Sequence, residues 1–214
     1  MKSIKIIKLK NKVAHQFNSI FEPNKLELGG GANNIRFGWH NLDMVNKPLE
    51  FKFTKNCVFP VKNNSINIIY SSHTFEHLDH KTIIRVLSEC KRILFESGKV
   101  IISIPDFDLI NIKYKNKDLD FFKDNYYSTE ALALLKKDNK ILDLDGYYYA
   151  LHHYQHLSYW TNKQFIKLFE NNKFKLVCND EDKIIKRYKA ITPNIEVKKA
   201  GSSYFEFVKI KEGI

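Results

Sequence analysis

The fold is predicted best from a glycine-rich stretch, Lys25-Leu-Glu-Leu-Gly-Gly-Gly31, which is followed closely by Gly38-Trp-His-Asn-Leu-Asp43. Residues 25–28 are predicted to form a short strand that runs into the three glycines. Glycine at a strand end permits positive φ angles and lets the backbone approach a ligand closely. Residues 39–43 are predicted to form a second strand, and the carboxylate of Asp43 at its end is able to accept both hydroxyls of a ribose. A nucleotide-like ligand at such a turn lies beyond the carboxyl ends of parallel strands.

Two common nucleotide-binding loops do not fit these glycines. The dinucleotide fingerprint Gly-x-Gly-x-x-Gly requires a third glycine where this chain has Asn34. A Walker A loop requires a Gly-Lys-Ser/Thr sequence, which does not follow. A simple glycine-rich turn that binds nothing is the alternative at this point.

The rest of the chain alternates apolar strands with helically spaced apolar residues. The predicted elements are a strand at 66–71, a helix at 81–95, a strand at 100–104 closed by Pro105, a helix capped by Thr161, and strands at 174–178 and 203–210. This alternation is typical of a largely parallel sheet covered on both faces.

Two segments depart from this alternation. Residues 106–159 are rich in Tyr, Phe, Asp and Lys and are predicted to form an insertion, or lid, rather than a separate domain. We therefore expect a single domain over residues 1–214. Residues 183–200 fit an ordered hairpin extension, a dimer contact or a mobile loop equally well.

The composition excludes several classes of protein. Of the 214 residues 43% are hydrophobic, which is enough for a buried core. No stretch approaches the roughly 20 apolar residues that span a bilayer, and the lysine-broken N-terminus is unlike a secretory signal. The three cysteines show no Cys-x-x-Cys spacing, which argues against a disulfide framework. We therefore expect a cytoplasmic protein without a membrane span.

The net charge of +11 is compatible with a polyanionic partner, but the kind of basic residue argues against one. Only 4 of the 35 Lys and Arg residues are arginines. Arginine is the preferred residue for bidentate contacts to phosphates and bases. Because the lysines are also spread along the whole chain, we expect a solvated surface rather than a nucleic-acid-binding face.

Several segments, in the right order, resemble the motifs of class I S-adenosylmethionine-dependent methyltransferases, and most closely methyltransferase type 11. They are the two segments quoted above, Phe59-Pro-Val-Lys-Asn-Asn-Ser-Ile-Asn67, Ile69-Tyr-Ser-Ser-His-Thr-Phe-Glu-His-Leu78, Arg85-Val-Leu-Ser-Glu-Cys-Lys-Arg-Ile-Leu94 with the strand to Pro105, and Trp160 to Phe174. The resemblance implies an α/β, Rossmann-like methyltransferase fold. Such a fold has a mostly parallel seven-stranded sheet, helices on both faces and, here, an inserted lid.

The resemblance also implies S-adenosylmethionine as the cofactor and assigns residues to it. Gly29, Gly30 and Gly31 would pass under its methionine and ribose, with Glu27 organising the loop. Asp43 would hold the ribose hydroxyls, and one of two neighbouring residues, Leu42 or Met44, would pack on the adenine.

Further along the chain, Ser71, Ser72 and His73 would lie near the methionine end of the cofactor and face the substrate. The acid with which the family often binds the adenine amino group is absent, and either the side-chain oxygen of Asn56 or the backbone would accept that hydrogen bond instead. For Glu76 and its neighbour His77 we expect a structural role in fixing the start of the next helix.

Methyl transfer is an in-line displacement at a sulfonium methyl, so the protein must align the acceptor and, for an alcohol or ammonium, remove a proton. Histidine is the natural base near neutral pH. The candidates for the base are His73, His152, His153, His156 and Asp106. A metal site built from two of the lid histidines, His152 and His156, is conceivable, but we expect no metal. Packing of the lid onto the sheet is the alternative role for these histidines.

An aromatic and polar lid suits a small polar acceptor. Methyltransferases with this strand pattern often resemble those of cell-surface polysaccharide gene sets, so we expect a sugar or a polysaccharide precursor as substrate. An RNA or other nucleic-acid methyltransferase is the alternative; the charge of +11 favours it, whereas the arginine shortage and the missing base-flipping motif oppose it. A non-catalytic binding protein with this fold is the third hypothesis. The acceptor atom and the oligomeric state are not indicated.

Overall fold

The computed structural model describes residues 25–30, 38–43, 51–52, 57–125, 156–189 and 201–211. Five of the predicted site residues lie outside these ranges: Gly31, Met44, Asn56, His152 and His153.

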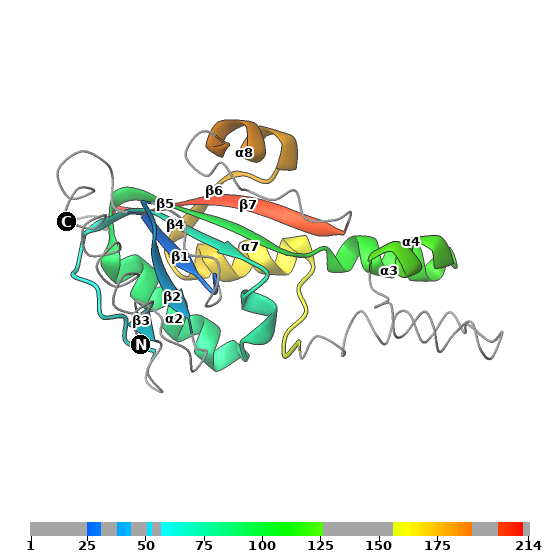
Figure 1. Ribbon diagram of the computed structural model, residues 1–214, viewed down its shortest axis with the longest axis horizontal. Helices are drawn as coiled ribbons and strands as arrows, with labels where there is room; N and C mark the ends of the chain where they lie inside the picture. Colours follow the sequence, from blue (N-terminus) through cyan, green and yellow to red (C-terminus); the bar gives the residue numbers. More distant parts are fainter. Residues whose placement is uncertain are drawn as a thin grey trace, which may run out of the picture.

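One seven-stranded sheet runs through the described part of the chain (Figure 1). Its strands are β1 (Lys25–Leu28), β2 (His40–Asp43), β3 (Phe51–Lys52), β4 (Ile66–Ser72), β5 (Leu94–Pro105), β6 (Phe174–Cys178) and β7 (Ser202–Lys209), in the order β3-β2-β1-β4-β5-β7-β6. Strands β1 to β5 pair in parallel, whereas β7 is antiparallel to β5 and β6. The predicted, mostly parallel seven-stranded sheet is confirmed. The strand order reverses between β1 and β4, the place where such sheets bind ligands.

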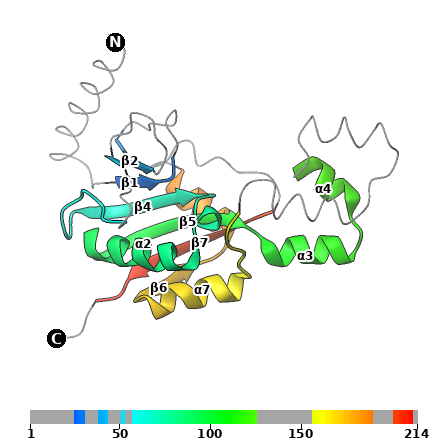
Figure 2. The same ribbon diagram turned by 90° about the horizontal axis from the view of Figure 1, so that it is seen from below.

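Helices cover both faces of this sheet. Helices α2 (His80–Ile93) and α7 (Asn162–Asn171) lie on one face, and α8 (Glu181–Tyr188) lies on the other (Figure 1). The short 3-10 helix η1 (Phe75–His77) follows β4, and α3 (Phe107–Lys115) and α4 (Leu119–Asn125) extend beyond the end of β5 (Figure 2). Among the helices described, none combines the length and apolarity that crossing a membrane requires.

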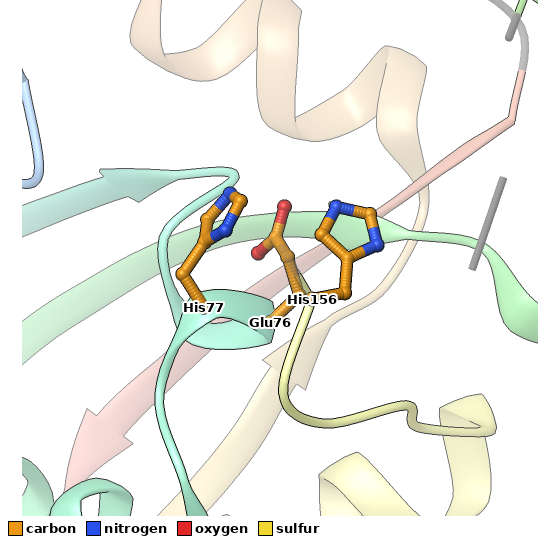
Figure 3. A group of neighbouring side chains, drawn as sticks. All are labelled: Glu76, His77 and His156. Atoms are coloured by element: carbon orange, nitrogen blue, oxygen red, sulfur yellow. The ribbon is translucent and has the colours of Figure 1, made fainter. Parts of the chain in front are cut away.

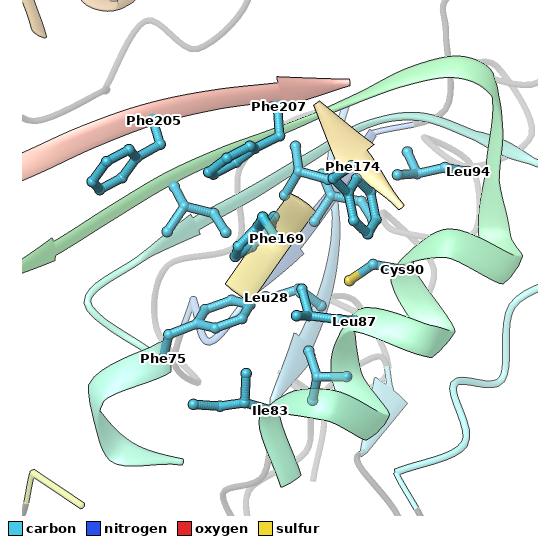
Figure 4. Packing of buried hydrophobic residues seen from close by; sticks show 14 of the residues in the cluster. Leu28, Phe75, Ile83, Leu87, Cys90, Leu94, Phe169, Phe174, Phe205 and Phe207 are labelled. Carbon is cyan, nitrogen blue, oxygen red and sulfur yellow. The ribbon is translucent and has the colours of Figure 1, made fainter. Parts of the chain in front are cut away.

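Aliphatic side chains and phenylalanine rings fill the main core between the sheet and helices α2 and α7 (Figure 4). Phe169 of α7 stacks on Phe207 of β7 with ring centres 4.1 Å apart, and Phe165 meets Phe75 edge to face at 5.9 Å. Cys90 of α2 is fully buried in this cluster, and burial raises the pKa of its thiol, which keeps it unreactive. A second cluster, which includes Trp39, Tyr70, Tyr188 and Tyr204, involves helix α8.

One boundary between a helix and a strand differs from the prediction. Helix α2 ends at Ile93 and β5 begins at Leu94, whereas the sequence predicted a helix to residue 95 and a strand from residue 100. Leu94 has an extended backbone, with φ −71° and ψ 138°, and pairs with Ile66 of β4. Pairing within the sheet therefore overrides the local helical pattern.

Three helices lie where the sequence predicted no helix. Helix α8 occupies the start of the unassigned segment 183–200 and is capped by Asp180, whose side chain accepts from the Lys183 amide at 3.1 Å. Residues 107–125 of the predicted lid form α3 and α4, and the part of that segment from 126 to 155 lies outside the described residues.

Candidate active site

The chain turns sharply at Gly29, directly after β1. Gly29 has a φ of +74°, and its N–H donates to the carbonyl oxygen of Leu42 at 2.8 Å, which ties the turn to β2. A Cβ at this position would lie only 2.0 Å from Oγ1 of Thr74. Both the backbone angle and the space therefore require glycine here.

Two acids lie at the carboxyl ends of β1 and β2. The carboxylate of Glu27, 3% exposed, lies against Gly30, where an added Cβ would come within 2.8 Å of its Cδ. Asp43 ends β2 and is 7% exposed. Because β1 and β2 are parallel and adjacent, these carboxylates belong to the same edge of the sheet.

These residues fit the nucleoside end of S-adenosylmethionine. The turn at Gly29 and Gly30 leaves no room for side chains, so backbone rather than side chains faces any ligand there. An acid at the end of the neighbouring strand, Asp43, is the chemical partner that ribose hydroxyls require. The assignment of Gly29, Gly30, Asp43 and Glu27 to the cofactor stays a prediction.

Leu42 has a different role from the predicted one. It is 0% exposed and belongs to the main core cluster together with Leu26 and Leu28. Side chains alternate along a strand, so Leu42 points to the opposite face from Asn41 and Asp43. The predicted packing of Leu42 on adenine is therefore corrected to a place in the core.

Hydroxyl groups hold the end of β4 against its neighbours. Ser71 is fully buried, and its Oγ donates to the carbonyl oxygen of Leu28 at 3.2 Å. Oγ of Ser103 on β5 donates to Oγ of Ser72 at 3.0 Å, and Thr74 Oγ1 donates to Leu28 O at 3.2 Å. These bonds place β4 beside the glycine turn, and the ligand contacts predicted for Ser71 and Ser72 stay predictions.

His73 lies directly after β4, between two polar side chains. It has a φ of +50°, and its amide donates to Ser103 O at 2.9 Å. Its Nε2 is 2.9 Å from Oγ of Ser202 on β7, and its Nδ1 is 3.0 Å from Oε1 of Glu76. The second contact has the distance of an ion pair without the angles of a hydrogen bond. Both ring nitrogens are thus occupied by polar neighbours.

Asp106 has a structural role in addition to its predicted role as a base. Its Oδ1 accepts from the Leu109 amide at 2.9 Å and caps helix α3. Its own amide donates to Gly201 O at 2.7 Å. The use of Asp106 as a base stays a prediction.

A pocket opens beyond the carboxyl end of β5. The hollow, including its open mouth, has a volume of about 290 Å³. The lining residues are Glu76, Ile104, Pro105, Phe107, Ile110, His156, Ser158, Tyr159 and Trp160.

One wall of this pocket, residues 156–160, is the end of the predicted lid. The amides of Leu157 and Ser158 donate to Glu76 O at 2.7 and 3.1 Å, and Ser158 Oγ donates to Phe75 O at 3.1 Å. The returning chain is therefore anchored on helix η1.

The structure brings two of the predicted histidines, His73 and His156, to one carboxylate. That carboxylate belongs to Glu76, and His77 lies beside it (Figure 3). The helix start that we expected Glu76 to fix is instead capped by Asp79, which accepts from Thr82 N at 2.8 Å.

Glu76 is thus a central residue of the candidate site, whereas the sequence analysis expected only a structural role for it. The sequence did contain a signal for this role. Three polar residues follow a buried strand closely: His73, Glu76 and His77. Such sheets bind ligands at the carboxyl ends of their parallel strands.

Comparison with known proteins agrees with this geometry. The profile of a family described as a methyltransferase domain matches residues 4–179. A search of curated proteins found no match.

Solved structures share the fold at low sequence identity. The YcgJ protein from Bacillus subtilis is 12% identical with a TM-score of 0.50, over 89% of this chain and 93% of that one. PKMT2 from Rickettsia typhi is 12% identical with a TM-score of 0.51, over 88% of this chain and 50% of that one. An S-adenosylmethionine-dependent methyltransferase from Mesorhizobium loti is 9% identical with a TM-score of 0.48, over 87% and 91%.

The fold and the profile together define an enzyme of the class I, S-adenosylmethionine-dependent methyltransferases, with S-adenosylmethionine as its cofactor. The chain belongs to the methyltransferase-domain family, as its motifs predicted.

Proposed function

We propose that this methyltransferase acts in the cytoplasm on a small polar acceptor, a sugar or polysaccharide precursor. The kinds of side chain around the hollow beyond β5 carry the proposal. Its wall combines aromatic rings, those of Tyr159 and Trp160, with polar groups from Glu76, His156 and Ser158. Pockets for small molecules have this composition, with apolar surface for contact and a few polar groups for orientation.

The charged residues of the described chain support a small acceptor over a nucleic acid. Arg92 is bonded to Glu89, and Arg187 is bonded to the buried Glu206. Two of the four arginines are therefore already paired with carboxylates of this protein, and bidentate phosphate contacts would need free guanidinium groups.

In the proposed reaction S-adenosylmethionine supplies an electrophilic methyl group. The turn at Gly29 and Gly30 and the acid Asp43 bind the cofactor. His73 takes the proton of the acceptor at Nε2, the nitrogen that now faces Ser202. The negative charge of Glu76 beside Nδ1 favours the tautomer with the proton on that nitrogen, which leaves Nε2 free to accept.

The cofactor assignment is tested by calorimetric titration with S-adenosylmethionine and S-adenosylhomocysteine. Asp43→Ala should weaken binding of both by at least about tenfold, because one charge-assisted hydrogen bond contributes roughly 1.5–3 kcal/mol. The control is Asp120→Ala, which removes an exposed acid on α4 and should bind like the wild type. Wild-type affinity in Asp43→Ala would refute the ribose assignment.

The acceptor class is tested with labelled S-adenosylmethionine and three pools: nucleotide sugars, glycans and total RNA. We expect label in the sugar or glycan pool. His73→Ala should lower turnover by about 10²-fold or more, as removal of a general base does, and the loss should remain when S-adenosylmethionine is saturating. Label in RNA alone would support the nucleic-acid alternative and overturn the sugar proposal.

A further inference from the structure

We infer that Glu76, His77 and His156 form a binding site for one divalent transition-metal ion, with zinc as the best-fitting ion. This goes beyond the proposed function and does not depend on the acceptor. One ligand atom of each residue lies within 4.8 Å of the other two. Figure 3 shows the two imidazole rings on either side of the Glu76 carboxylate.

The carboxylate of Glu76 is the feature that calls for a cation. Its side chain is 3% exposed, and neither of its oxygens has a hydrogen-bond partner in the described part of the chain. A buried carboxylate without hydrogen bonds is strongly destabilising unless a charge compensates it. Nδ1 of His73 approaches Oε1 at 3.0 Å. A cation between the carboxylate and the rings of His77 and His156 would give the carboxylate a second partner besides His73.

The kinds of ligand indicate which metal fits. Two imidazole nitrogens and one carboxylate oxygen form a ligand set that zinc uses in enzymes. Magnesium and calcium prefer ligand sets made of oxygen atoms alone. The sequence paired His156 with His152, whereas the structure pairs His156 with Glu76 and His77.

The geometry requires only a small adjustment of side chains. Around a tetrahedral zinc ion with bonds of about 2.0–2.2 Å, neighbouring ligand atoms are about 3.4 Å apart. The side-chain atoms, which lie within 4.8 Å of one another, must therefore close by at most about 1.4 Å. His77 is exposed, and its ring meets that of His156 edge to face with centres 5.0 Å apart. The amides of Leu157 and Ser158 already bind the backbone after His156 to Glu76 O.

Three protein ligands leave at least one position of the ion open. Two of the ligands, Glu76 and His156, also line the pocket beyond β5. The open position therefore faces the pocket, where water or a polar atom of a bound molecule would complete the coordination.

The test begins with the full chain, stripped by a chelator and desalted. Calorimetric titration with zinc chloride should show one equivalent bound, and cobalt(II) should give the visible spectrum of a four- or five-coordinate ion. His77→Ala and His156→Ala should each weaken zinc binding by more than about tenfold, because even residues behind the ligands have effects of this size.

His80→Ala is the matched control, since His80 is a nearby exposed histidine outside the cluster; it should bind zinc like the wild type. Glu76→Gln tests the carboxylate ligand if circular dichroism shows that the variant is folded. His77→Ala tests the site without this condition, because His77 is exposed and its replacement should not disturb folding. No binding to the wild type, or equal loss in the His80→Ala control, would overturn the site. S-adenosylmethionine titrations of the same samples report on the proposed function separately.

Discussion

The hydroxyl of Tyr188, in helix α8, lies 2.6 Å from Oε1 of Glu206, a β7 residue that is 0% exposed. Lys99 Nζ lies 3.0 Å from the same oxygen, and Arg187 pairs with the other one. One buried carboxylate thus collects three donors and holds α8 on the sheet. Burial alone would raise the pKa of Glu206, but the hydrogen bonds from Tyr188 and Lys99 and the two cationic charges outweigh it and lower that pKa.

This network predicts a loss of stability in acid. Because the pKa of Glu206 is lower in the folded state than in the unfolded state, its contribution is present above the unfolded pKa, about 4.3. The contribution is lost as the pH falls through the folded pKa. Glu206→Gln should lower the free energy of unfolding at pH 7 by about 2 kcal/mol, less than for a fully buried pair because the cations are partly exposed.

The measurement is urea unfolding from pH 3 to pH 7. Glu206→Gln should show a shallower decline below pH 5 than the wild type. Glu96→Gln is the control, since Glu96 forms an exposed pair with Lys211 and should change little. Parallel pH profiles for the wild type and Glu206→Gln would contradict the assignment.

A second prediction concerns Arg92, which fastens the loop before β4 to helix α2. Its guanidinium donates to Glu89 at 2.6 and 2.7 Å and to the carbonyl oxygens of Phe59 and Val61 at 2.9 and 2.8 Å. The side-chain hydrogen bond from Arg92 is also the main cause of the lowered pKa of Glu89. A lysine cannot reproduce this planar set of donors. Arg92→Lys should therefore cost about 2 kcal/mol in urea unfolding.

Arg85→Lys is the control for Arg92→Lys, because Arg85 is an exposed residue of the same helix. Its free energy of unfolding should stay within about 0.5 kcal/mol of the wild type. Equal losses in the two variants would show that the loop does not depend on the Arg92 contacts.

A third prediction concerns the start of α7. Thr161 and Gln164 form a reciprocal capping box, in which Thr161 Oγ1 accepts from Gln164 N at 3.2 Å and Gln164 Oε1 accepts from Thr161 N at 3.1 Å. Thr161→Ala should reduce the free energy of unfolding by about 1 kcal/mol. Thr161→Ser keeps the hydroxyl and should restore most of it. A serine variant as unstable as the alanine variant would assign the effect to the lost methyl group instead.

A fourth prediction concerns the contact between Gly29 and Thr74. Gly29→Ala should destabilise the protein by more than about 1 kcal/mol, because alanine is strained at a positive φ, and it should also weaken cofactor binding. Part of the cost is the clash with Thr74 Oγ1. The double variant Gly29→Ala with Thr74→Ala should therefore be more stable than the sum of the single changes predicts. Simple additivity, measured by thermal unfolding, would contradict a direct clash.

Local sequence signals predicted the elements whose cause is itself local. The strand at Phe174–Cys178 has the predicted bounds, and Thr161 is the predicted cap, since apolar pattern and capping depend on neighbours in the chain. The start of β5 at Leu94 was missed because it depends on pairing with Ile66 in another strand. Helix α8 was missed because it has only eight residues, of which Ile184 and Tyr188 alone are buried.

The same contrast between local and long-range causes applies to the candidate site. The glycine turn and Asp43 were predictable because a strand, a turn and an acid follow one another closely in the sequence. Leu42 was assigned to adenine although strand alternation turns it into the core. The meeting of Glu76 and His156 depends on how the chain returns to η1 after the segment at 126–155, and no pattern within either segment encodes that return.

The place of β7 between β5 and β6 has a consequence for biosynthesis. Both neighbours of β7 precede it in sequence, so a ribosome makes them before their common partner exists. Until residue 209 has emerged, β6 has no strand to pair with, and the edge of β5 that later pairs with β7 is exposed. The nascent chain therefore carries an open sheet edge while residues 106–209 are made, which is the interval in which a chaperone has a surface to protect.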